Sequence, residues 1–166
     1  MADADADADA ETETRIRVEL SNTAIDPESF RSDIEHPDVG AHAWFAGVTR
    51  RTTGDRITES LFYEAHASMA VKQLQRLAAD AAGRFGLVAV VMVHRLGHVP
   101  VGDCAILLGV SSPHRVACFE SLAWLMDRIK TEVPVWKRET AGGARSGAGQ
   151  GGAKWIHPGY DGESTR

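Results

Sequence analysis

The hexapeptide PVWKRE at residues Pro134–Glu139 marks the point where a helix gives way to a strand. Its proline cannot continue a helical hydrogen-bond ladder, so the preceding helix must end there, and the valine and tryptophan that follow favour a strand. Lys130 lies in the last helical turn before the break, and Lys137 lies on the new strand. Two ordered elements would thus hold two amines near one point, although lysine is also favoured at a solvated helix end for electrostatic reasons alone.

The other elements are predicted from apolar residues, which recur every second residue in strands and every 3.6 residues in helices. The predicted strands are Arg15–Leu20, Ala41–Arg50, Ile57–Ala65, Leu87–His94, Cys104–Ser111 and Lys154–Ile156. The predicted helices start at Asp26, at Ser68 and at Ser112-Pro113, and the third of them, which reaches about Glu132, is expected to be the longest. Strands and helices therefore mix without strict alternation, which favours an α+β domain with a mainly antiparallel sheet and three main helices.

Three local features refine this outline. The polar segment 51–56 contains a glycine and predicts a hairpin loop that pairs the strands 41–50 and 57–65. The segment Gly97–Gly102 predicts a turn, and Gly86 is expected to stop the second helix. Each long helix is expected to bury one apolar stripe. The stripe residues are Met69, Leu74, Leu77, Ala81 and Phe85 in one helix and Phe119, Leu122, Leu125, Met126 and Ile129 in the other.

Length and composition indicate one globular domain between two polar ends. The chain has 166 residues, of which 43% are hydrophobic and 25% are charged, which is enough for one core. Residues 1–14 repeat Ala-Asp and then Glu-Thr, which predicts a disordered acidic arm. The single domain is expected at 15–157, with a Gly-rich loop insertion at 142–153, and residues 158–166 are expected to form a loose tail.

The net charge of −5 comes from the acidic arm rather than from the domain. Six of the 23 acidic residues lie in the first 13 positions, which leaves 17 acids against 18 lysines and arginines. A domain this close to neutrality argues against a nucleic-acid surface and permits a local anion pocket. The chain has neither a secretory signal nor an apolar run long enough for a membrane, so we expect a cytoplasmic protein.

Few residues suggest metal or thiol chemistry. Cys104 and Cys118 are expected to be reduced thiols on a strand and a helix, and the chain has no C-x-x-C pattern, so no metal site is predicted.

His114 and Arg115 open a predicted helix, where free backbone N–H groups and the helix dipole attract anions. They are a candidate phosphate site, and the alternative is a basic pair without a ligand.

The hexapeptide Pro134–Glu139 also resembles the P-[IV]-W-K-[KR]-E signature of the large, catalytic subunit of molybdopterin synthase. Four further segments agree with that family in the same order, and the match spans residues 25 to 157. The segments are Gly40-Ala41 through Phe45-Ala46-Gly47 to Arg50, Leu61–Ala65 with Met69-Ala70, His94–Gly97 through Val101-Gly102-Asp103, and Ser111–Arg115 with Phe119-Glu120.

The resemblance implies an α/β-hammerhead fold, a homodimeric core and a sulfurtransferase without a cofactor of its own. Sulfur would pass from the thiocarboxylated Gly-Gly C-terminus of a small ubiquitin-like subunit to cyclic pyranopterin monophosphate, giving the dithiolene of molybdopterin. Two small subunits on the dimer would make a heterotetramer. The alternative is a catalytically inactive relative that only binds the ubiquitin-like partner or an anion.

The resemblance also assigns the site residues, with Lys130 and Lys137 as the catalytic pair. Lys137 would transfer protons, and Lys130 would lie beside the C-terminus of the partner. The expected substrate-binding residues are Phe45, Val48, Thr49, Arg50, His114, Arg115, Arg138 and Glu139. Two of them depart from the family pattern, because Thr49 stands where the family prefers valine and Val48 where it often has a basic residue.

The spacing along the third helix predicts a site shared between two copies of the chain. His114 and Lys130 are 16 residues apart, which places their backbones about 24 Å apart on one helix. A pterin monophosphate is too small to bridge that distance. If both cation groups serve one substrate, His114 and Arg115 must come from one subunit, and Lys130 and Lys137 from the other.

Overall fold

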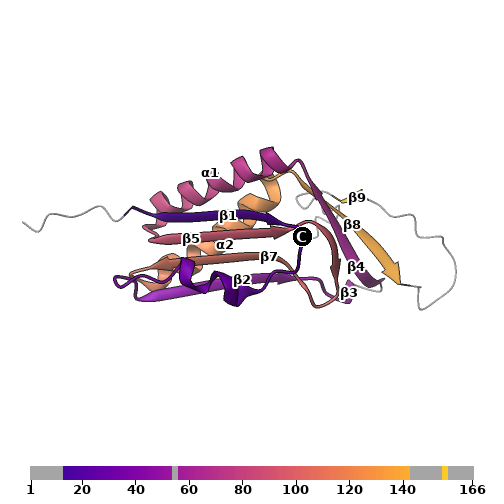
Figure 1. Cartoon of the computed structure of the whole chain (residues 1–166), viewed down its shortest axis with the longest axis horizontal. Coiled ribbons are helices and arrows are strands. Elements are labelled where there is room, and N and C mark those ends of the chain that lie inside the picture. Colours follow the sequence, from indigo (N-terminus) through magenta and orange to yellow (C-terminus); the bar gives the residue numbers. More distant parts are fainter. Residues whose placement is uncertain (1–12, 54–55, 143–154, 157–166) are drawn as a thin grey trace, which may run out of the picture.

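The computed structural model describes residues 13–53, 56–142 and 155–156, which form two β-sheets and three helices (Figure 1). The first is a four-stranded sheet with the order β1-β5-β7-β2. In it, β1 and β5 run parallel, whereas β5 and β7, and β7 and β2, run antiparallel. Its strands are β1 (Arg15–Ser21), β5 (Ala89–Arg95), β7 (Cys104–Ser112) and β2 (Ala41–Val48).

A five-stranded antiparallel sheet stands at one end of the first sheet, at the right of Figure 1. Its long strand β4 pairs with β8 and also with the short strands β3 and β6, while β9 pairs with β8. The strands are β3 (Thr52–Thr53), β4 (Arg56–Ala65), β6 (Gly97–Pro100), β8 (Val135–Gly142) and β9 (Trp155–Ile156). Among the described strands only β1 and β5 pair in parallel, so the predicted α+β class with mainly antiparallel pairing is confirmed.

Helices α1 (Ala67–Phe85) and α2 (Arg115–Glu132) pack on one face of the four-stranded sheet, and the short 3-10 helix η1 (Pro27–Asp33) packs on the other. Strand β5 is therefore buried on both faces: Val90 faces the long helices and Val91 faces η1. Burial on both faces explains why its sequence is a continuous apolar run instead of an alternating one. No helix in the described ranges is long and apolar enough to cross a membrane.

Three predicted helix boundaries are confirmed. The Asp26 carboxylate accepts a hydrogen bond of 3.1 Å from the backbone N–H of Glu28 and so caps η1. Gly86 ends α1 with φ of 62°, a left-handed conformation that a side chain would disfavour. Helix α2 ends at Glu132, before Pro134, as the proline requires.

The predicted hairpin between strands 41–50 and 57–65 is wrong. Strand β2 pairs with β7, whereas β4 belongs to the other sheet. The chain leaves the four-stranded sheet at Thr49, whose backbone N–H donates to Asp103 O and whose carbonyl accepts from Gly102 N. These two bonds tie the end of β2 to the turn before β7, so the chain turns a corner between the sheets there.

Two further boundaries differ from the predictions. Gly97–Pro100 is not a turn but strand β6, which pairs with β4, and the turn follows it. Helix α2 begins at Arg115 with His114 as its N-cap, because Ser112 is still paired with Ala41 in the β7–β2 ladder. At 18 residues α2 is shorter than α1, which has 19.

The predicted apolar stripes each contain one residue that the structure exposes. Met69 in α1 is 49% exposed and Phe119 in α2 is 64% exposed. In contrast, Leu74 and Leu125 are fully buried in the core between the helices and the sheet. Phe119 lies beside β2, the last strand of its sheet, so no further strand covers it.

The polar ends and the Gly-rich segment are largely outside the described residues. Thr14 is described, and its hydroxyl donates to Leu87 O at 3.1 Å, so the fold starts one residue before the predicted boundary. Gly142 is the last residue of β8 and pairs with Ile57, so it belongs to a strand and not to a loop. Residues 1–12 of the predicted arm, residues 143–153 of the insertion, Lys154 and the tail lie outside the described ranges.

Candidate functional site

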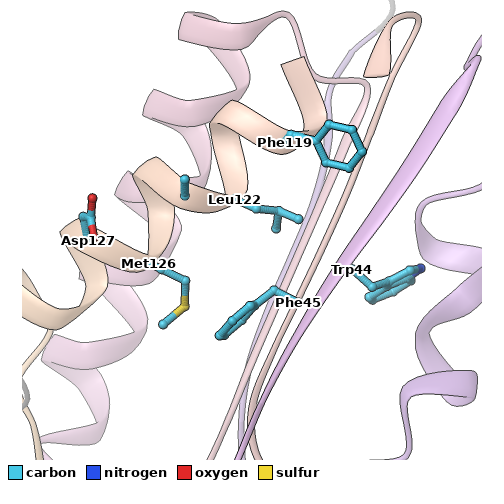
Figure 2. A pocket seen from close by; sticks show the side chains of 7 residues that line it. Trp44, Phe45, Phe119, Leu122, Met126 and Asp127 are labelled. Atoms are coloured by element: carbon cyan, nitrogen blue, oxygen red, sulfur yellow. The ribbon is translucent and has the colours of Figure 1, made fainter. Parts of the chain in front are cut away.

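A groove runs between helix α2 and the edge strand β2 (Figure 2). Its volume is about 380 Å³, a size that suits a small-molecule ligand. Phe45 from β2 and Met126 from α2 point into the gap between the two elements, while Trp44 points to the other side of the strand. The lining residues are Trp44, Phe45, Phe119, Leu122, Ala123, Met126 and Asp127.

Helical spacing places Lys130 on the side of α2 that lines the groove. Phe119, Ala123 and Met126 recur at three- and four-residue steps, so they share one face of α2, and Lys130 follows Met126 by four. Lys130 is exposed, and its ammonium makes no hydrogen bond or ion pair with any other described residue. Lys130 therefore places a positive charge one helical turn beyond Met126, on the side of α2 that lines the groove.

Lys137 lies on β8, shortly after the end of α2. Val135, two residues earlier, is buried in the core, and side chains two apart on a strand share a face. Lys137 therefore points to the side of β8 that faces the core, and it is half-buried there. The two predicted catalytic lysines are thus carried by the last turn of α2 and by the strand that follows it.

The structure separates Arg138 from Lys137. Arg138 is the next residue on β8 and points to the opposite face, where its guanidinium carbon lies 5.3 Å from the centroid of the Phe62 ring. Glu139 is on the same side as Lys137, and its carboxylate accepts a hydrogen bond from the Thr58 hydroxyl. Neighbouring residues on a strand point to opposite faces, so Glu139 and Arg138 lie on different sides of β8.

The two residues that follow β2 differ in exposure: Thr49 is buried and has a structural role, whereas Arg50 is an exposed cation. Thr49 is 2% exposed and makes the two backbone bonds of the corner between the sheets, so its side chain presents almost no surface to a ligand. Val48 and Arg50 are exposed. Since β2 runs antiparallel to β7 and α2 returns along them, Arg50 lies at the same end of the domain as Lys130.

His114 and Arg115 lie at the opposite end of α2. His114 is the N-cap residue but makes no side-chain capping bond, and both side chains are exposed. An 18-residue helix is about 27 Å long, so a single chain does not bring this pair together with Lys130.

Both cysteines are free thiols, as expected. Burial raises the pKa of Cys118, whose Sγ lies 3.4 Å from Ala41 O, and it also raises the pKa of the half-buried Cys104. A raised pKa leaves little thiolate at neutral pH, so neither suits a nucleophile. The described residues hold no group of three or more side chains that could bind a metal ion.

Sequence reasoning missed most of the groove. It assigned Leu122 and Met126 to the core and gave no role to Ala123 or Asp127. The sequence feature that could have indicated the groove is the four-residue step from Met126 to Lys130. It places Lys130, a predicted catalytic residue, on the same face of α2 as apolar side chains.

Two helices on a mixed sheet, with a second, antiparallel sheet across its end, define an α+β protein, and an apolar groove lies at the edge of its first sheet. The family model described as MoaE protein matches residues 20–132, and the chain belongs to this family.

Named relatives and solved structures agree with this assignment. The crystal structure of molybdopterin synthase from Staphylococcus aureus is similar with a TM-score of 0.72 and 31% identity, over 86% of this chain and 96% of that one. The molybdopterin synthase catalytic subunit of Bacillus subtilis is 35% identical over 73% of this chain and 77% of its own length. The match covers 63% of the Emericella nidulans relative of the same name and 33% of the one from Drosophila willistoni.

Proposed function

We propose that this chain is the catalytic subunit of a molybdopterin synthase. It would transfer sulfur from the thiocarboxylated C-terminus of a small ubiquitin-like subunit to cyclic pyranopterin monophosphate, forming the dithiolene of molybdopterin. The family membership and the names of the relatives support this assignment. The observation that carries it is the apolar groove along α2, with Lys130 one helical turn beyond Met126 and Lys137 on β8, the strand that follows the helix.

The chemistry of the groove matches the parts of such a substrate. Phe45 and Met126 offer an aromatic ring and a thioether to the faces of a flat pterin. Lys130 would attract the carboxylate or thiocarboxylate at the partner's C-terminus, because the two groups carry opposite charges. Lys137 would exchange protons with the reacting pterin carbons and sulfur.

A phosphate on the substrate needs further cations, and these suggest a dimer. Arg50 lies at the Lys130 end of the domain, whereas His114 and Arg115 lie at the other end of α2. In a two-fold dimer the same pair of surfaces meets twice, so His114 and Arg115 of one copy could complete the groove of the other. The exposed Phe119 and the open edge of β2 would then be covered by the second copy.

A reconstituted assay tests the proposal. The purified chain, a thiocarboxylated small partner that ends in Gly-Gly, and cyclic pyranopterin monophosphate should yield the dithiolene product. Lys137→Ala should abolish turnover while the melting temperature and partner binding stay near wild type, and Lys130→Ala should weaken both turnover and engagement of the partner's C-terminus. Lys72→Ala removes an exposed lysine on α1 and serves as the control.

Two results would contradict the proposal. Normal product formation by Lys137→Ala would remove this residue from the mechanism. Partner binding without any turnover by the wild-type chain would favour the alternative of a non-catalytic binding module.

A further inference from the structure

Two aromatic rings lie behind Lys137, where the sheets meet. Tyr63 on β4 is directly opposite Lys137 in the β4–β8 ladder. The centroid of its ring is 5.1 Å from that of His94, and the planes cross at 72°, an edge-to-face contact that is favourable for two rings. Tyr63 therefore links β4, which pairs with the strand that carries Lys137, to the end of β5.

The imidazole of His94 is held in place by burial and by a hydrogen bond. It is 6% exposed, and its Nδ1–H donates to Arg95 O at 2.9 Å, which holds the orientation of the imidazole. Burial lowers the pKa of His94, so the ring is neutral at physiological pH and places no second cation behind the lysine. Burial also raises the pKa of Tyr63, which keeps its phenol neutral.

Lys137 depends on packing for its position. Directly opposed residues of an antiparallel pair have Cβ atoms about 5 Å apart on the same face, so the side chains of Lys137 and Tyr63 leave the sheet as neighbours on one face. Two residues along the strands, on the same face, the opposed pair Val135 and Ala65 packs into the core, which fixes the register of β4 and β8. No described residue forms a hydrogen bond or an ion pair with the Lys137 ammonium, so no polar contact among them determines where the amine lies.

We propose that Tyr63, held by His94, is the positioning residue for Lys137. Its ring limits the rotamers of a side chain that has four rotatable bonds and directs the amine toward the region where α2 ends. A general acid or base that is already oriented loses less entropy when the transition state forms. The inference rests on the proposed role of Lys137 in sulfur transfer, because positioning matters only if that amine reacts.

The first test measures the side chain itself and needs no activity. Trace acetylation with acetic anhydride, followed by mass spectrometry, compares Lys137 with the exposed Lys72 in each variant. Tyr63→Leu should free the half-buried lysine and raise its relative acetylation by about twofold or more, whereas Tyr63→Phe should match the wild type. The control is Phe85→Leu, which removes an edge-to-face ring contact with Trp124, at 6.0 Å and 67°, on the outer helices.

The second test separates positioning from stability. Tyr63→Leu should lower kcat by about tenfold or more with KM nearly unchanged, and Tyr63→Phe should keep wild-type kcat. Phe85→Leu, which loses a comparable ring contact, should keep kcat at a temperature where both variants are folded.

Unchanged acetylation of Lys137 in folded Tyr63→Leu would overturn the proposal, as would a loss of kcat no larger than that of Phe85→Leu. If the wild-type chain has no sulfur-transfer activity, the proposed function fails, and the acetylation ratio still decides whether Tyr63 orients Lys137.

Discussion

Register decides what single residues on β8 can do. Lys137 and Arg138 are neighbours in the sequence, yet one faces Tyr63 and the other lies over Phe62 on the far side of the strand. A slip of one residue would exchange their faces and move the lysine off the core-facing side of β8. The buried Val135 prevents such a slip, because it would have to leave the core.

His94 should make stability depend on pH in a defined direction. Burial lowers its folded pKa below the usual value of about 6.5, so the unfolded chain binds a proton that the folded chain excludes. The stabilising contribution is complete above about pH 6.5 and is lost as the pH falls from there toward the folded pKa, by at most about 1.4 kcal/mol per pH unit.

Urea unfolding between pH 5 and 8 measures this effect. His94→Gln should lose that part of the slope, whereas His98→Gln, which changes an exposed histidine on β6, should keep the wild-type slope. An unchanged slope in a folded His94→Gln protein would show that His94 is not the group responsible.

At the scale of elements, helix α1 buries only part of its predicted apolar stripe. Leu74 is 1% exposed and packs in the main core, while Met69 belongs to the same predicted stripe but is exposed near the start of the helix. The buried side of the helix starts at Ala70, which is fully buried, and Met69 is one residue earlier, about 100° around the helix axis, so its side chain points away from the sheet.

A pair of substitutions in α1 tests this division. Leu74→Ala should lower the free energy of unfolding by about 2–5 kcal/mol, because it removes a buried side chain and leaves a cavity. Met69→Ala should cost less than about 1 kcal/mol, since half of that side chain is already in water. Equal losses in urea unfolding would mean that Met69 is covered in solution, for example by a second copy of the chain.

At the scale of the whole molecule, the two groups of cations stand at opposite ends of the domain. Arg50, Lys130 and Lys137 lie toward the five-stranded sheet, and His114 and Arg115 lie where α2 begins. This separation agrees with the distance expected from helical rise alone and is the reason for proposing a site shared between two copies.

Mixing two inactive variants tests the shared site. The double variant His114→Ala/Arg115→Ala and the variant Lys137→Ala should each be inactive as homodimers. After subunit exchange a mixed dimer would contain one intact site, so about a quarter of the wild-type activity should return when exchange is complete. No recovery, with exchange verified by mass spectrometry of labelled subunits, would contradict the model.

Local sequence rules determined the elements and much of the candidate site. Asp26, Gly86 and Pro134 mark boundaries because capping, left-handed backbone and the missing N–H of proline act within a few residues. The helix break at Pro134 also predicted that Lys130 lies at a helix end and that Lys137 lies on the strand that follows. The resemblance over most of the chain named the family that the comparisons confirm.

Only the tertiary structure decided which strands pair and which apolar residues stay exposed. Strand β2 pairs with β7 instead of β4, because the corner at Thr49 is held by a turn more than 50 residues away in the sequence. Phe119 has the spacing of a core residue but is exposed, because β2 is the edge of its sheet. Burial depends on what the rest of the chain brings to a surface, and helical periodicity cannot encode that information.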